Sequence, residues 1–189
     1  MKTVLYDGKP AKANDRPDLA GGRPEQEMMT YKFLDKLGIG YKRADHDPAE
    51  DMDACTAIEK VLKAPICKNL FLCNRQQTSF YLLMMPGDKV FKTKELSHQI
   101  GSARLSFAPE EKMAEYLDIL PGAVSVMGLM NDTEHHVRLL VDEDVLSGEY
   151  VGCHPCVNTS SLKIRTDDVF HTFLSAVHHD YQTVRLTGE

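Results

Sequence analysis

The chain has 189 residues, of which 42% are hydrophobic and 26% charged, a composition typical of a globular protein with one sizeable core and not of a disordered chain. Its formal net charge of -6 counts against broad, non-specific binding to DNA or RNA, because such binding requires a basic surface. No apolar run is long enough to span a membrane, and the N-terminal apolar stretch ends after Tyr6, too early for a signal peptide, so we expect a cytoplasmic protein.

The N-terminal third predicts an extension followed by two helices. Residues 1–23 are polar and rich in proline and glycine, which predicts a loosely held extension. A helix is expected over residues 24–37, because Pro24 suits a first turn and Gly38 suits a helix end. A second helix is expected over residues 53–63, where apolar residues recur at helical spacing.

Strand patterns dominate the remainder of the chain. Apolar runs predict strands, several of them in consecutive pairs joined by turn residues, over 67–73, 79–85, 103–108, 123–130, 135–141, 159–164 and 181–186. Helices are expected near residues 93–100, 109–117 and 166–177. Strict alternation of strand and helix is missing. We therefore predict an α+β fold, with a mixed, largely antiparallel, barrel-like sheet and helices packed outside it, in a single domain over residues 24–189.

The pair Lys68–Asn69 opens the buried strand NLFLC and is the first candidate for chemistry. A lysine at a strand entry can anchor a phosphate or stabilise a developing negative charge, and the neighbouring amide can donate to a carbonyl. The alternative is a lysine that extends along the strand end with its amine in solvent.

The segment 152–159, GCHPCVNT, is the second candidate. His154 can donate or accept a proton near neutral pH, and Pro155 stiffens the turn that presents Asn158. An ordinary turn, in which the polar side chains bond their own backbone, explains the same residues.

The two cysteines of this loop, Cys153 and Cys156, allow a thiol-redox or metal-site interpretation. A redox motif of this spacing begins a helix, whereas β-branched residues follow here. A zinc site needs about four ligands, and no second closely spaced Cys or His pair follows at a suitable distance. With five cysteines in all, we expect reduced thiols, no metal and no cofactor.

The segment 122–128, GAVSVMG, is the third candidate. Glycines at both ends allow the backbone to approach a ligand closely and to direct N–H groups at it, although a strand with a bulge explains the pattern equally. No Gly-Lys-Ser/Thr sequence follows, so the segment is not a phosphate loop.

The order of these motifs carries more information than any one of them. KNLFL, YLLMM, ARLSFA, PGAVSVMGLMND and HPCVNTSSLKI, followed by a helix that runs into His178–His179, resemble the YbaK-type aminoacyl-tRNA deacylase family. Within that family the chain is most similar to the free-standing prolyl-tRNA editing proteins. The resemblance covers about residues 24–186.

The resemblance implies hydrolysis of a mischarged aminoacyl ester, most often Ala-tRNA(Pro), by a water molecule and without a covalent intermediate. It makes Lys68 and His154 the catalytic residues. The implied substrate-binding residues are Asn69, Gly122, Ala123, Val124, Ser125, Val126 and Asn158. The sequence departs from the family's Gly-x-x-x-Pro loop at Val126, where the pattern has proline, which bears on the shape of the substrate pocket.

The implied partner is the aminoacylated CCA end of a tRNA, and prolyl-tRNA synthetase is a further partner that the resemblance suggests. A non-catalytic module that binds aminoacyl-tRNA or a free amino acid with the same pocket is the principal alternative. A thiol-redox protein built on Cys153 and Cys156 is the third.

Overall fold

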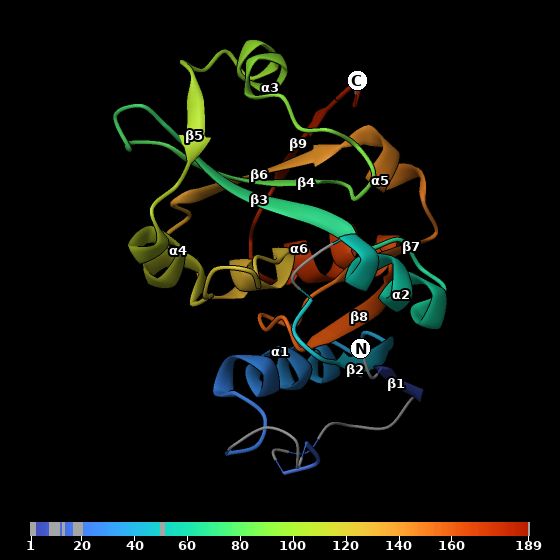
Figure 1. Cartoon of the computed structure of the whole chain (residues 1–189). Helices are drawn as coiled ribbons and strands as arrows, with labels where there is room; N and C mark the ends of the chain where they lie inside the picture. Colours follow the sequence, from blue (N-terminus) through green and yellow to red (C-terminus); the bar gives the residue numbers. More distant parts are fainter. Residues whose placement is uncertain (1–2, 8–11, 13, 17–20, 50–51, 189) are drawn as a thin grey trace.

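The structure is a computed structural model that describes residues 3–7, 12, 14–16, 21–49 and 52–188. The described residues form two β-sheets with helical segments around and between them (Figure 1). The predicted α+β class, with a mixed and largely antiparallel arrangement of strands, is confirmed, but the strands divide into two sheets instead of forming a single one. Within the described residues, no helix is both long and apolar enough to cross a bilayer.

The first sheet is antiparallel throughout. Its strand order is β1 (Thr3–Asp7), β2 (Tyr41–His46), β8 (Ser160–Arg165) and β7 (Tyr150–Cys153). Neither β1 nor β2 was predicted from the sequence. Strand β2 (YKRADH) carries charged residues at positions that are buried in the structure, which hides its strand pattern.

The second sheet is mixed. Its strand order is β5 (Leu105–Phe107), β3 (Cys67–Asn74), β4 (Phe80–Pro86), β6 (Val137–Asp142) and β9 (Tyr181–Val184). Strands β3 and β4 form the predicted antiparallel hairpin, whereas β4, β6 and β9 run parallel. The central strand β4 is buried on both faces, which explains its unbroken apolar run FYLLMM.

The helical segments are α1 (Glu25–Lys36), α2 (Met52–Leu62), α3 (Thr93–Gln99), α4 (Glu110–Leu117), the 3₁₀ helix η1 (Val126–Met130), α5 (Glu143–Ser147), the π-helix η2 (Asp168–Phe173) and α6 (Leu174–Ala176). The helices predicted near residues 24–37, 53–63, 93–100 and 109–117 are confirmed. The helix predicted over residues 166–177 is present as the π-helical η2 followed by the single turn of α6.

The strand predicted over residues 123–130 is wrong. Ser125 caps the 3₁₀ helix η1 by accepting a hydrogen bond from the Met127 N–H at 3.2 Å. Gly128 packs so tightly that an added Cβ would lie 2.6 Å from the Ile119 side chain. Capping and close packing therefore override the β-branched composition of this segment.

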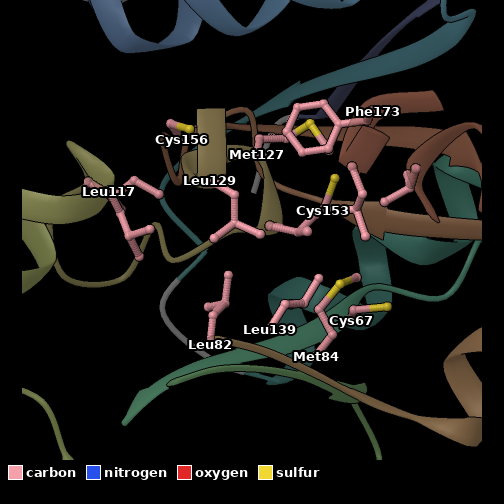
Figure 2. Close-up of a cluster of buried hydrophobic side chains, with 14 of the residues drawn as sticks. Cys67, Leu82, Met84, Leu117, Met127, Leu129, Leu139, Cys153, Cys156 and Phe173 are labelled. Atoms are coloured by element: carbon pink, nitrogen blue, oxygen red, sulfur yellow. The ribbon is translucent and has the colours of Figure 1, made fainter. Parts of the chain in front are cut away.

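The largest core cluster lies between the two sheets. Figure 2 shows Leu82, Met84 and Leu139 of one sheet meeting Cys153 of the other, together with Met127 and Leu129 of η1. Side chains of η2 belong to the same cluster. The expectation that all helices pack outside the sheet is therefore wrong for η1 and η2, which fill the space between the sheets.

The described part of the N-terminal segment is held by ion pairs, contrary to the loose attachment predicted for residues 1–23. Arg23 pairs with Glu27 of α1 and with Asp45 of β2, and all three side chains are buried. Arg16 donates hydrogen bonds to the carbonyl oxygens of Thr159 and His46. The domain boundary at residue 24 stays a prediction.

Candidate active site

Lys68 lies on the wall of a pocket of about 330 Å³ at the start of β3. Its Nζ donates to the Lys89 carbonyl oxygen at 2.9 Å, which leaves two N–H groups of the ammonium for a ligand. Glu59 and Asp88, which carry carboxylates, also line this pocket. The pocket can therefore receive a ligand that carries both positive and negative charge.

Asn69 follows Lys68 in the strand and so points to the opposite face of the sheet. Its Nδ2 donates to the Cys67 carbonyl oxygen at 3.1 Å. Its Oδ1 is buried and has no hydrogen-bond partner within the described part of the chain. The group that remains for a ligand is thus an acceptor, not the donor expected from the sequence.

His154 is half-buried at the end of β7, and its Nδ1 lies 2.9 Å from the Ser160 carbonyl oxygen. A carbonyl accepts only, so Nδ1 carries the proton, and the neutral ring presents Nε2 as an acceptor. Burial lowers the pKa of His154 to about 4, despite the opposing hydrogen bond to Ser160. The imidazole is therefore neutral at physiological pH and suited to orient a hydroxyl or a water molecule.

A junction of the two sheets lies just before Lys68 and His154 in the sequence. Ile66 forms a parallel bridge with Gly152, and the Gly152 N–H donates to the Pro65 carbonyl at 2.7 Å. Lys68 and His154 each lie two residues beyond this bridge in the same chain direction. The contact depends on Gly152, because an added Cβ would lie 2.6 Å from the Pro65 oxygen.

A second pocket, of about 420 Å³, contains two of the remaining predicted residues. Ala123 and Asn158 line it, and the Asn158 amide lies 3.4 Å from where a Cβ on Gly122 would be. Gly122 has φ of +85°, a conformation that favours glycine. The segment after Gly122 and the loop after His154 thus share one cavity.

The other residues of the Gly122–Val126 stretch have structural positions. Val124 packs partly buried against the core, and Ser125 and Val126 are fully buried. Neither Ser125 nor Val126 lines the pockets described above. The departure from the family pattern at Val126 therefore concerns the packing of η1 and acts on the pockets only through the backbone.

Sequence reasoning missed two residues next to His154. Ser161 on β8 and His46 on β2 form a hydrogen-bonded chain with it, at 3.2 Å from Ser161 Oγ to His154 Nδ1 and 2.9 Å from Ser161 Oγ to His46 Nε2. The available signal was the sequence His46–Asp47–Pro48, which repeats the combination of a histidine with a proline turn seen at His154–Pro155.

Cys67, Cys153 and Cys156 have no environment for redox chemistry. Burial raises the pKa of Cys67 and of Cys156 to about 12, and raises that of Cys153 further. Nucleophilic thiolates require a lowered pKa, so these thiols are inert packing groups. Within the described residues no group of three or more His, Cys, Asp or Glu side chains is arranged to hold a metal ion.

Comparison with known proteins identifies one family. Residues 46–171 match the aminoacyl-tRNA editing domain family. The prolyl-tRNA editing protein ProX of Acetoanaerobium sticklandii is 32% identical over 136 residues, which cover 72% of this chain and 83% of that protein. The prolyl-tRNA synthetase associated domain-containing protein 1 of Mus musculus is 31% identical over 166 residues, which cover 86% of this chain and 96% of that protein.

Among solved structures, the crystal structure of a candidate trans-editing enzyme for prolyl tRNA synthetase has a TM-score of 0.64 at 16% identity. The match covers 87% of this chain and 98% of that one, and it shows a common fold. With two thirds of the chain matched to one family and relatives above 30% identity, the predicted resemblance is confirmed: the chain belongs to the aminoacyl-tRNA editing domain family and is an aminoacyl-tRNA deacylase.

Proposed function

We propose that this deacylase edits in trans, by hydrolysing alanine from Ala-tRNA(Pro) that prolyl-tRNA synthetase has mischarged. The observation that carries the proposal is the Lys68 ammonium on the wall of its pocket, with two N–H groups left for a ligand. The Ile66–Gly152 bridge, which lies two residues before both Lys68 and His154, supports it. The choice of alanine and proline rests on the resemblance and on a relative named as a prolyl-tRNA editing protein.

The charges of the Lys68 pocket suit an aminoacyl ester at the end of an RNA chain. The substrate carries an α-ammonium group on the amino acid and a phosphate on the terminal nucleotide. The Glu59 and Asp88 carboxylates can pair with the ammonium, and the two remaining N–H groups of Lys68 can bind the phosphate or a ribose oxygen. The unpaired CCA end can enter a pocket of this kind, since single-stranded RNA is usually read unstacked.

Hydrolysis needs a positioned water molecule and a stabilised oxyanion. The water oxygen bonds to the ester carbonyl carbon, the carbon–oxygen bond to the ribose breaks, and the ribose oxygen takes a proton that the water gives up. With a pKa of about 4, His154 is a weak base at neutral pH, so it orients the water or a ribose hydroxyl through Nε2.

The deacylation assay tests this proposal. Purified protein is incubated with Ala-tRNA(Pro), and in parallel with Ser-, Cys- and Pro-tRNA(Pro), and loss of the ester is followed. We expect turnover of Ala-tRNA(Pro), sparing of Pro-tRNA(Pro), and a loss of roughly ten- to a hundredfold in Lys68→Ala, on the order of one hydrogen bond to a charged group. A non-catalytic binding module would retain the RNA without turnover.

Lys163 provides a matched control. It is also half-buried, and its Nζ also donates to a carbonyl oxygen at 2.9 Å, that of Lys63, but it does not line the Lys68 pocket. Lys163→Ala is expected to keep turnover within about threefold of the unmodified protein, since surface contacts contribute little. Cys153→Ser is expected to do the same, since the buried thiol takes no part in the reaction. Equal losses in Lys68→Ala and Lys163→Ala would contradict a specific role for Lys68.

A further inference from the structure

We infer that Ser161 and His46 are positioning residues, which hold His154 in the tautomer and orientation that expose its Nε2 acceptor. This inference rests on the deacylase function proposed above. Ser161 contacts the His154 ring and His46 contacts Ser161, so each acts through His154 and not on the substrate.

The three side chains form a continuous hydrogen-bonded chain across the first sheet. His46 Nδ1 lies 2.8 Å from the Asp47 carbonyl oxygen, and its Nε2 lies 2.9 Å from Ser161 Oγ. Ser161 Oγ in turn lies 3.2 Å from His154 Nδ1. His46 and Ser161 are 1% and 0% exposed, so bulk water does not compete for these bonds.

The two carbonyl groups at the ends determine where each proton lies. The Asp47 carbonyl accepts only, so His46 carries its proton on Nδ1 and presents Nε2 as an acceptor. Ser161 therefore gives its hydroxyl proton to His46, and a lone pair of Oγ faces His154. The His154 Nδ1–H is then held by two acceptors, Ser161 Oγ and the Ser160 carbonyl.

The consequence lies on the far side of the His154 ring. With its proton fixed on Nδ1, the ring presents Nε2 as an acceptor, and Nε2 has no hydrogen-bond partner among the residues that the structure describes. In metal and catalytic sites, the hydrogen bond made by one histidine ring nitrogen likewise determines whether the other nitrogen donates or accepts. A hydroxyl or water molecule at Nε2 is thus oriented by two residues that do not contact it.

Burial, more than the charged groups nearby, keeps the two imidazole rings neutral. The Arg16 guanidinium donates to the His46 carbonyl oxygen and lies 3.6 Å from the Asp45 carboxylate. Burial lowers the pKa of His46, the Arg16 charge adds to that effect, and the Asp45 and Asp47 charges oppose it. Both rings are therefore neutral near pH 7, as the proton assignment requires.

The test compares Ser161→Ala with Ser161→Thr, which keeps the hydroxyl, and with Ser97→Ala. Ser97 is another buried serine, bonded to the Thr93 carbonyl in α3, remote from His154 in the fold. For Ser161→Ala we expect kcat for Ala-tRNA(Pro) to fall roughly three- to tenfold, about one hydrogen bond, with KM unchanged. Ser161→Thr and Ser97→Ala are expected to keep the original kcat.

A spectroscopic readout separates positioning from simple stabilisation. With ¹⁵N-labelled histidine, the unmodified protein is expected to show His154 as the Nδ1–H tautomer, and Ser161→Ala and His46→Gln to shift that tautomer ratio. If His154 of the unmodified protein carries its proton on Nε2, the inference is overturned and no variant needs to be measured. An unchanged kcat and ¹⁵N pattern in a folded Ser161→Ala variant also overturn it. Absence of turnover by the unmodified protein defeats the proposed function instead, and the ¹⁵N measurement still tests the positioning.

Discussion

Arg23 is the centre of a buried ion-pair network, and its replacement by alanine is expected to destabilise the protein strongly. The Arg23 side chain is fully buried and contacts the carboxylates of Glu27 and Asp45, which are 0% and 4% exposed. It also contacts the partly exposed Asp15. Arg23→Ala therefore leaves two buried carboxylates without their principal partner.

The magnitude follows from what remains around those carboxylates. Removing one partner of a buried ion pair costs roughly 3–5 kcal/mol. Ser160 Oγ lies 2.9 Å from Glu27 and 2.7 Å from Asp45, and Tyr31 donates to Glu27 at 2.6 Å, so part of the loss is offset. We therefore expect the lower end of that range, about 3 kcal/mol, which in a chain of this size lowers Tm by roughly 6–12 °C.

The assay is urea unfolding at pH 7 followed by circular dichroism, with Arg185→Ala as the control. Arg185 pairs with Glu143 at the surface, where its side chain is 77% exposed, and its loss should change the unfolding free energy by no more than about 1 kcal/mol. Adding Glu27→Gln to Arg23→Ala should recover part of the loss, because it removes one unpaired charge. Equal, small effects of Arg23→Ala and Arg185→Ala would refute the reasoning.

Two further predictions concern the sheet junction and pH. Gly152→Ala should cost about 1–3 kcal/mol and reduce turnover, since its Cβ would lie 2.5 Å from the Ile66 side chain and 2.6 Å from the Pro65 oxygen. Gly40→Ala, with no atom within 4 Å, should be neutral in the same unfolding assay, and an equal effect of the two would contradict the clash. The unfolding free energy should fall as pH drops from about 6.5 to about 4, because over this range the unfolded chain protonates the His154 side chain and the folded one does not. His154→Gln should flatten that decline in urea titrations at pH 4, 5 and 7, and an unchanged slope would contradict the lowered pKa.

Local chemistry in the sequence was sufficient for much of the fold. The unbroken apolar run of β4 predicted a buried strand, and Pro24 and Gly38 predicted the ends of α1, because these signals depend on neighbouring residues alone. The pairing of β3 with β4 followed from the turn between them. The order of motifs was enough to predict the family, and family membership is confirmed.

Only the tertiary structure decided which side chains meet. The sequence of strand β2 is polar. Arg43 and Asp45 are buried there because they pair with each other and with Asp15 and Arg23 of the N-terminal segment. Lys68 and Asn69 are adjacent in sequence yet face opposite sides of a sheet. His46 is more than 100 residues from Ser161 and His154, yet the three side chains form one series of hydrogen bonds. Sequence patterns record the environment of each residue along its own strand or helix, but strand pairing across long separations determines its contacts.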